Sequence, residues 1–163
     1  MKTKHKTELG WAMHRALVGT KSFFVRTIPN VVANLRWPWL RFSWDSSWYY
    51  DIPKGWRKAF GKEMASRVQK LVNAHIKVMR KRGSKVKSSD VVSIGEIKEK
   101  WGQLRICAWA PNDILEVIEY YEHVSWDHCV FCGRLAEYHT TGWILPVCGK
   151  HRKGHPSKRK EED

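Results

Sequence analysis

Three cysteines and one histidine near the C-terminus have the spacing of a metal site. Cys129 and Cys132 are separated by two residues, and after fifteen more residues Cys148 and His151 repeat that spacing. A C-x-x-C segment brings its two sulfurs together, and zinc is usually held by four sulfur or imidazole ligands at tetrahedral corners. The sequence therefore predicts one structural Zn²⁺ ion, because four protein ligands leave no open position for a catalytic water.

Three other histidines could replace His151 as the fourth ligand, namely His128, His139 and His155. His151 is preferred because it follows Cys148 at the same spacing that separates the first two cysteines. The alternative for Cys129 and Cys132 is a redox pair, but no β-α-β thioredoxin pattern surrounds them. Cys107 stands apart from the motif and is expected to be a small buried side chain.

The residues between the two ligand pairs must return the chain to the metal. Residues 134–139 and 143–147 are short strand candidates joined by a turn at residues 140–142, and such a hairpin brings both ligand pairs together. Gly133 directly follows the first pair, where the turn often needs a positive φ. A module of about 30 residues buries too little surface to fold alone. The metal would supply the folding energy, on the order of 10 kcal/mol in zinc-finger peptides.

The charge of the chain is high and unevenly distributed. The 163 residues include 30 Lys and Arg and 16 Asp and Glu, a formal net charge of +14. Residues 53–87 contain twelve Lys or Arg and one acid, Glu63, whereas residues 91–127 contain three Lys or Arg and seven acids. This asymmetry favours a directed basic face and a polyanionic partner, such as nucleic acid, a nucleoprotein machine or an anionic membrane. The alternative is a basic protein without such a partner.

A long amphipathic helix is expected to carry the basic face. Asp51 can cap it, Pro53 fits its first turn and Gly83 can end it. Apolar residues recur along it from Trp56 to Met79 with helical spacing. The opposite face displays cations over about 35 Å at 1.5 Å per residue, and more cations follow in the next loop and around the second ligand pair. The predicted nucleic-acid-binding residues are Lys58, Lys62, Lys70, Lys77, Arg80, Lys81, Lys85, Lys87, Lys150, Arg152 and Lys153. The alternative is that these cations only form a solvent-exposed face without a partner.

An aromatic segment precedes this helix. Seven of the fourteen residues from Trp37 to Tyr50 are aromatic. Aromatic rings interleaved with Arg can stack on unpaired bases, at about 1–3 kcal/mol per base. Such rings can equally build a core, because each buries a large area, and both interpretations stay open. If part of the segment faces a partner, we expect Trp37, Trp39 and Arg41 to face outward.

A hairpin and a short helix should follow the long helix. Residues 91–110 alternate apolar and polar side chains around a turn at residues 100–102, which predicts two strands. Asn112 is expected to cap a helix at residues 113–124. The exposed side of that helix should be acidic, formed by Glu116, Glu119 and Glu122.

The expected fold is α+β and has four parts. They are a basic and aromatic N-terminal arm with short helices (1–50), a core of long helix, hairpin and short helix (51–127), a zinc-ribbon or treble-clef-like module (128–154) and a disordered charged tail (155–163). No run of about 18 apolar residues is present, so no transmembrane segment is expected. The N-terminus lacks the apolar centre of a signal peptide. We therefore expect a cytoplasmic protein, in which cysteines stay reduced.

Several of these segments resemble a group of small zinc-finger proteins of bacteriophages and bacterial prophages. Residues 97–106 read IKEKWGQLRI, and after a helix come CVFCG, the pair Gly142–Trp143 and a closing C-x-x-H. The resemblance covers about residues 90–151. It implies a phage or mobile-element setting, a location in the host cytoplasm and a zinc site at the four residues of the motif, but no reaction.

The sequence favours a non-enzymatic protein that binds nucleic acid through its phosphate backbone. The alternative is a protein-interaction module or inhibitor that docks on a host nucleic-acid enzyme such as a polymerase, a nuclease or the ribosome. A minor alternative is an HNH-like nuclease, because the two ligand pairs resemble the two zinc-binding pairs of such enzymes. Only fifteen residues lie between the two pairs here, and they include His139 but no Asn. This segment is too short for the ββα catalytic unit of an HNH nuclease. No catalytic residue is therefore predicted.

Overall fold

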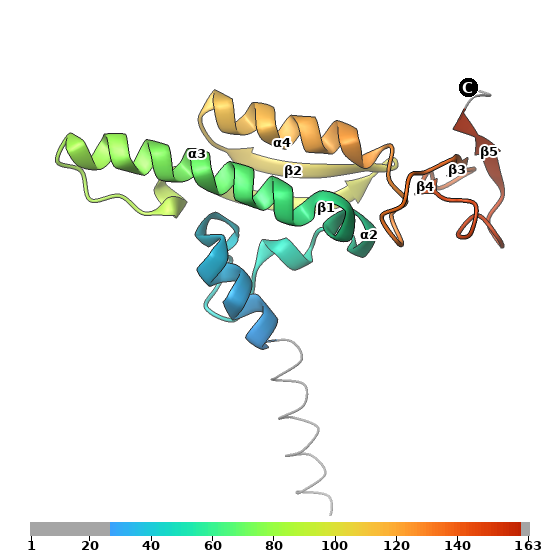
Figure 1. Cartoon of the computed structure of the whole chain (residues 1–163), viewed down its shortest axis with the longest axis horizontal. Helices are drawn as coiled ribbons and strands as arrows, with labels where there is room; N and C mark the ends of the chain where they lie inside the picture. The colour runs from blue at the N-terminus through green and yellow to red at the C-terminus, as the bar shows by residue number, and fades with distance from the viewer. Residues whose placement is uncertain (1–26, 161–163) are drawn as a thin grey trace, which may run out of the picture.

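The computed structural model describes residues 27–160, which form an elongated α+β fold with two small sheets (Figure 1). A helix at residues 27–36 and two 3₁₀ turns, η1 (Pro38–Leu40) and η2 (Trp48–Tyr50), precede the long helical segment. That segment consists of α2 (Lys54–Trp56), the π-helical turn η3 (Arg57–Gly61) and α3 (Lys62–Lys81), and the short turn η4 (Ser88–Asp90) follows it. The predicted α+β class is confirmed. The start of the predicted N-terminal arm and the end of the tail lie outside the described residues.

The long helical segment ends where the sequence predicts but begins later. Gly83 has a φ of 86°, and its amide donates to the carbonyl of Arg80 (3.0 Å), which terminates the helix. At the other end, Asp51 does not cap the segment, because it lies at the end of η2. Pro53 has an extended ψ of 139° and separates Asp51 from the first helical residue, Lys54.

A two-residue turn joins β1 (Ser93–Lys100) to β2 (Gln103–Trp109) in an antiparallel hairpin. Lys100 pairs with Gln103, and the two residues between them, Trp101 and Gly102, have φ values of 54° and 81°. Two positive φ values define the type I′ turn, whose twist matches that of a hairpin. The turn therefore lies where the sequence predicts it.

Helix α4 (Asn112–Ser125) lies along β2 and beside α3 (Figure 1). Its buried residues are Ile114, Ile118, Tyr121 and Ser125. They face a core that includes Met64 and Val68 of α3 and Leu104 of β2. The expectation that Asn112 caps the helix is wrong, because Asn112 is the first helical residue and Pro111 precedes it without a capping side chain.

Part of the aromatic segment before the long helix belongs to the core, whereas Phe42, Trp44 and Tyr50 are exposed. Trp37 and Trp39 are only 4% and 2% exposed, so the expectation that they face outward is wrong, whereas Arg41 is exposed. The indole nitrogens of the two tryptophans donate to Ser66 Oγ (3.2 Å) and to the Ala65 carbonyl (3.1 Å) on α3. Buried indoles remove a large apolar area from water and need acceptors for their N–H groups. Trp37 and Trp39 therefore attach the N-terminal arm to α3.

Cys107 is exposed, so the expectation of a small buried side chain is wrong. The buried side chains of β2 are Leu104 and Ile106. Because side chains of a strand alternate between its two faces, Cys107 lies on the face opposite to the core.

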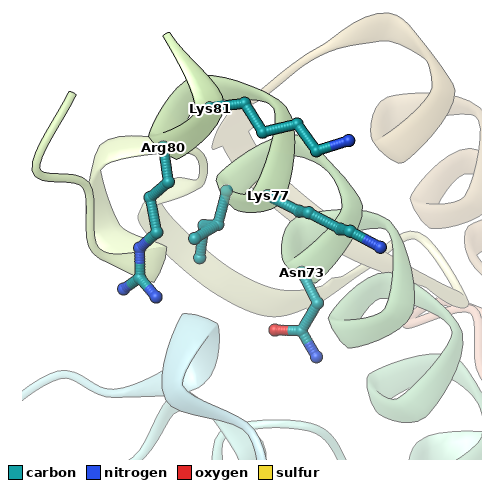
Figure 2. Close-up of a pocket in the computed structure, with 5 residues that line it drawn as sticks. Asn73, Lys77, Arg80 and Lys81 are labelled. Atoms are coloured by element: carbon teal, nitrogen blue, oxygen red, sulfur yellow. The ribbon is translucent and has the colours of Figure 1, made fainter. Parts of the chain in front are cut away.

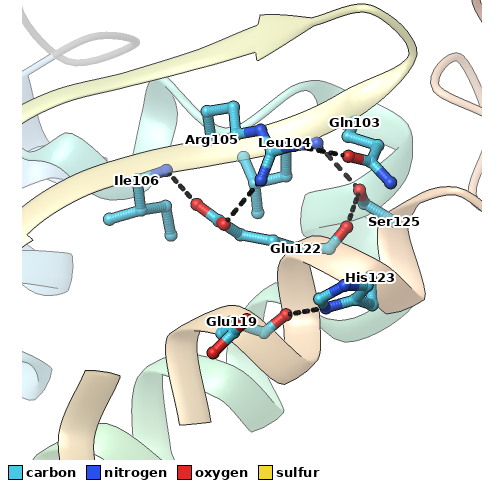
Figure 3. Close-up of polar contacts among 8 residues, drawn as sticks. All are labelled: Gln103, Leu104, Arg105, Ile106, Glu119, Glu122, His123 and Ser125. Carbon is cyan, nitrogen blue, oxygen red and sulfur yellow. Dashed lines mark hydrogen bonds and ion pairs between the residues drawn. The ribbon is translucent and has the colours of Figure 1, made fainter. Parts of the chain in front are cut away.

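Side chains of α4 accept hydrogen bonds from backbone amides on the edge of β2 that faces away from β1 (Figure 3). The Leu104 amide donates to Ser125 Oγ (2.8 Å), and the Ile106 amide donates to Glu122 Oε1 (2.6 Å). Glu122 Oε2 also accepts a hydrogen bond from Arg105 (3.1 Å). In a two-stranded hairpin, alternate amides of each strand point away from the partner strand, and a buried amide without an acceptor is costly. Ser125 and Glu122 provide those acceptors.

This role corrects the expectation that Glu122 is an exposed acid, while Glu116 and Glu119 are exposed as expected. Replacing Glu122 by alanine leaves the Ile106 amide without its acceptor, and we expect the free energy of unfolding to fall by about 1–3 kcal/mol. Chemical denaturation measures this change. Glu119→Ala on the same helix is the control and should change the stability by less than about 0.5 kcal/mol. Equal losses for the two variants would contradict the role of Glu122.

The C-terminal sheet has three strands in the order β4–β3–β5. The strands β3 (Tyr138–Thr140) and β4 (Pro146–Val147) form the hairpin predicted between the ligand pairs, although both are shorter than predicted. The prediction of a disordered tail from residue 155 is wrong for β5 (Ser157–Arg159), because its backbone pairs with β3.

Candidate functional site

The structure brings the four predicted metal ligands together. The Sγ atoms of Cys129, Cys132 and Cys148 and a ring nitrogen of His151 all lie within 4.8 Å of one another. His151 Nδ1 is 3.3 Å from Cys148 Sγ and 3.5 Å from Cys129 Sγ, and Cys132 Sγ is 3.7 Å from Cys148 Sγ. With metal–ligand bonds of about 2.0–2.3 Å, the ligand atoms of a tetrahedral ion lie roughly 3.3–3.8 Å apart. The cluster therefore has the size of a site for one metal ion.

The other histidines that could replace His151 lie outside this cluster. His128 Nδ1 lies 3.0 Å from a backbone carbonyl of α4. The ring of His139 is buried, with its centroid 3.9 Å from that of Trp126. His155 is exposed. Among the described residues, the geometry thus supports His151 as the fourth ligand.

Two backbone turns position the ligands. In the first turn, the Cys129 amide donates to the Arg134 carbonyl (2.7 Å), and the Gly133 amide donates to the Cys129 carbonyl (2.8 Å). Gly133 has a φ of 78°, as the sequence predicts. In the second turn, which follows β4, the amide of His151 donates to the carbonyl of Cys148 (2.9 Å). Each turn directs two ligand side chains to the same point.

The cluster shifts the ionisation of its thiols in opposite directions. Burial raises the pKa of Cys129, and backbone amides of Cys148 and Cys132 only partly offset this effect. Burial also opposes ionisation of Cys148, but hydrogen bonds from the backbone and ring of His151 and from Cys132 outweigh it and lower the pKa of Cys148 to about 6. At neutral pH Cys148 is therefore largely the thiolate, which is the form that binds a metal.

The first ligand turn packs directly on the start of the long helical segment. The Gly55 amide donates to the Val130 carbonyl (2.9 Å), and the Trp56 indole donates to the His128 carbonyl (2.7 Å). A Cβ atom on Gly55 would lie 2.2 Å from the Cys129 carbonyl oxygen, and one on Gly133 would lie 2.4 Å from the Gly55 carbonyl oxygen. Two glycines thus allow the two backbones to touch and connect the Cys/His cluster to the core.

Replacing Gly55 by alanine should separate these backbones. The added methyl group meets backbone atoms that cannot rotate away, and we expect a loss of about 1–3 kcal/mol in the free energy of unfolding. Thermal and chemical denaturation measure this loss. Gly61→Ala in the same helical segment is the matched control, because its methyl group meets only the flexible side chain of Arg57 at 3.2 Å and ring atoms of Tyr49. If both variants were as stable as the wild type, the close packing at Gly55 would be refuted.

The cations predicted on the long helix form an exposed basic surface on one side of it. Lys58, Lys62, Lys70, Lys77, Arg80 and Lys81 are all exposed. Within residues 27–160, the ion pairs with carboxylates involve His75, Lys98, Arg105 and Lys160, and none of the six. The single acid of this segment, Glu63, accepts a hydrogen bond from Tyr121 of α4 (2.7 Å). The six cations of this surface therefore have no ion-pair partner among the described residues.

The last turns of α3 surround a shallow hollow of about 510 Å³ (Figure 2). Asn73, Lys77, Arg80 and Lys81 contribute to its lining. In Figure 2 the ammonium groups of Lys77 and Lys81 point to one side, and the Arg80 guanidinium points away from them. Arg80 donates to the Val86 carbonyl (3.1 Å) and so holds the following loop against α3. The hollow is open, and three of these four lining residues are basic.

The remaining predicted cations lie at two other places. Lys85 and Lys87 are exposed in the loop after α3, where they border a second hollow with Arg80. Lys150, Arg152 and Lys153 are exposed around His151. The structure thus places the predicted cations on the surface, but in separate groups along the molecule and not in one patch.

Sequence reasoning misses a pair of exposed tryptophans, Trp101 and Trp143. Their rings are nearly parallel, with centroids 6.4 Å apart. The available signal is the position of Trp101 in the predicted turn, where a side chain has no neighbours to bury it. The approach of Trp143 depends on the contact between the hairpin and the C-terminal segment that carries the Cys/His cluster (residues 128–160), and a sequence pattern does not contain this contact.

No family model, no curated protein and no solved structure matches the chain. Within residues 27–160, none of the helices combines the length and the apolar character needed to cross a bilayer.

Proposed function

We propose that the protein is a non-enzymatic nucleic-acid-binding protein whose fold is held by one structural Zn²⁺ ion. The observation that carries this proposal is the exposed basic surface of α3, whose cations have no acidic partner among the described residues. Each unpaired cation adds to the self-repulsion of the fold, and binding to phosphates relieves that repulsion.

The dimensions of the basic surface fit a nucleic-acid backbone. The twenty residues of α3 extend over about 30 Å, and phosphates of one strand follow each other at about 3.4 Å along the axis of a duplex. Lys70, Lys77 and Lys81 lie on one side of the helix, seven and four residues apart. Flexible lysines of this kind bind phosphates without reading base edges. The proposed contact should therefore not depend on the base sequence of the nucleic acid.

Zinc is the metal that best fits the ligand set. Three thiolates and one imidazole in a tetrahedral arrangement are typical of structural zinc. All four ligands come from the protein, which leaves no position for a catalytic water. The metal would hold the C-terminal segment in shape, together with the groups that flank it.

Binding to labelled duplex DNA at increasing salt tests the nucleic-acid proposal. We expect the logarithm of the binding constant to fall linearly with the logarithm of salt concentration, with a slope of about −0.9 for each phosphate contact. Two duplexes of different sequence should bind with similar affinity. Affinity that does not respond to salt would contradict a backbone contact, and metal analysis of the same preparation tests for one zinc ion per chain.

A second candidate function is docking on a host protein that acts on nucleic acid. It is favoured by exposed apolar residues of the N-terminal part, namely Leu35, Phe42 and Trp44. Large exposed aromatic side chains are frequent anchors of protein interfaces. A protein partner retained from a nuclease-treated lysate, and lost on replacing Phe42 and Trp44 by alanine, would support this function. The resemblance to phage proteins makes the cytoplasm of a bacterial host the proposed setting for both functions.

A further inference from the structure

Trp101 and Trp143 form an aromatic surface that is open to solvent. They are 64% and 68% exposed, and their ring planes differ by 26°. A centroid distance of 6.4 Å is near the long end of the range for contacting rings. Much of the surface of both rings therefore stays exposed to solvent. This exposure is unfavourable, because burial of large apolar side chains stabilises a fold.

The backbone at Trp101 is strained. Its φ of 54° makes it the single residue other than glycine with a positive φ in the described part of the chain. The first central position of a type I′ turn strongly prefers Asn, Asp or Gly. A bulky side chain in this region of φ is an outlier, and such strain is characteristic of functional sites. Folding alone does not account for tryptophan at this position.

One carboxylate holds the pair in place. Glu99 Oε1 accepts from the Gly102 amide (2.7 Å), and Glu99 Oε2 accepts from the Trp143 indole nitrogen (3.1 Å). Glu99 thus connects the hairpin turn to the segment that carries Trp143. Gly102 also lies against Ile144, so the contact between the two segments is close.

Cations flank the pair. Lys100 precedes Trp101 and is exposed. Gly142, which precedes Trp143 in the chain, lines a hollow of about 280 Å³ together with Lys158 and Trp126. Exposed aromatic rings with neighbouring cations are the combination that binds unpaired bases, because the rings stack on bases while the cations contact phosphates.

We propose that Trp101 and Trp143 form a stacking site for the unpaired bases of single-stranded nucleic acid. This inference rests on the proposed function and adds to it a preference for single strands over duplexes. Bases inside a duplex already stack on each other and cannot reach the rings, whereas bases of a single strand can. Glu99 is a positioning residue, since it orients Trp143 without contacting the bases.

Fluorescence anisotropy with the full-length metal-bound protein tests the site. The probes are a labelled oligothymidylate of about 12 nucleotides, within the range of known single-strand sites, and a duplex of the same length. The variants are Trp101→Asn and Trp143→Ala. Trp109→Ala is the matched control, because Trp109 is 70% exposed at the opposite end of the same hairpin.

We expect each of the two variants to weaken binding of the single strand by roughly 5- to 140-fold, the measured range for one stacked base. Binding of the duplex should change by less than about twofold, and Trp109→Ala should leave both affinities unchanged. Trp101→Asn suits the type I′ turn, so its melting temperature should equal or exceed that of the wild type. This result would exclude a merely structural role for Trp101.

Other outcomes overturn the inference in distinguishable ways. If the wild type binds both probes and the two variants bind the single strand normally, the stacking site is refuted and the proposed function stands. Equal losses for the single strand and the duplex would also refute base stacking. A wild-type protein that binds neither probe would refute the proposed function itself.

Discussion

We expect the replacement of Cys129 by serine to weaken metal binding strongly and to destabilise the C-terminal segment around the Cys/His cluster. Cys129 is fully buried and lies within reach of the other ligands. Structural zinc contributes on the order of 10 kcal/mol in zinc-finger peptides. Losing even a quarter of that free energy weakens the metal affinity by roughly 60-fold. The strands β3, β4 and β5 contain only three, two and three residues and are too short to compensate for this loss.

Metal analysis and hydrogen exchange measure the effect. We expect one zinc ion per wild-type chain and less than one in the variant, with faster amide exchange in residues 128–160 and little change in α3 and α4. A strong chelator should produce the same exchange pattern in the wild type. Cys107→Ser is the control, because Cys107 is an exposed cysteine of β2 outside the cluster. A Cys129→Ser protein that keeps a full equivalent of zinc would show that the cluster is not the metal site.

Replacing Lys70, Lys77 and Lys81 by glutamine together should remove most of the affinity for duplex DNA. The three side chains are exposed, and none pairs with a carboxylate of the described residues, so the fold should tolerate the change. Each phosphate contact contributes a slope of about −0.9, so three contacts supply a factor of roughly 100 in affinity at about 0.15 M salt. Arg80 is left intact, because it holds the loop through the Val86 carbonyl.

The salt dependence distinguishes a direct contact from a loss of folding. In the triple glutamine variant the slope should become less steep by about three, while the melting temperature should not decrease, since like charges are removed. The triple arginine variant keeps the charge and should bind as the wild type does. Wild-type affinity and slope in the glutamine variant would show that α3 does not contact the phosphates.

The two sites can be tested independently because they lie far apart. The hairpin turn with Trp101 contacts the C-terminal segment through Gly102 and Ile144, whereas α3 ends at the opposite end of the molecule (Figure 1). The lysine variants should therefore weaken single-stranded and duplex ligands alike, and the tryptophan variants only the single strand. A ligand that contacts both ends must be extended.

Local patterns were sufficient to predict several features from the sequence. The repeated spacing of Cys129, Cys132, Cys148 and His151 predicts the cluster, because a two-residue separation fixes how closely two ligands of one turn approach. The amphipathic period of the long helix predicts its buried and basic sides. Gly133 was likewise predictable, since its positive φ depends on the turn in which it lies.

Only the tertiary structure decided which aromatic residues are buried. Trp37 and Trp39 are buried because α3 offers them an apolar surface and acceptors at Ser66 and Ala65, far away in sequence. Trp101 remains exposed because it is placed at the tip of the hairpin. Composition cannot separate these cases, because burial depends on the elements that meet around a side chain and not on its neighbours in the chain.

The sequence also could not predict the contacts that join the C-terminal segment with the Cys/His cluster to the core. In the sequence, Gly55 and Gly133 are only glycines at a helix start and in a turn. The structure shows that they allow two backbones to approach closely. In the sequence, Glu99 is only one acid in a predicted strand. The structure shows that it accepts hydrogen bonds from Gly102 and Trp143. The sequence by itself determined the ligands, the basic helix and the turns, since these depend on spacing over a few residues. The packing of distant segments determined the stacking pair and the junction, since both require an approach in space that no local pattern encodes.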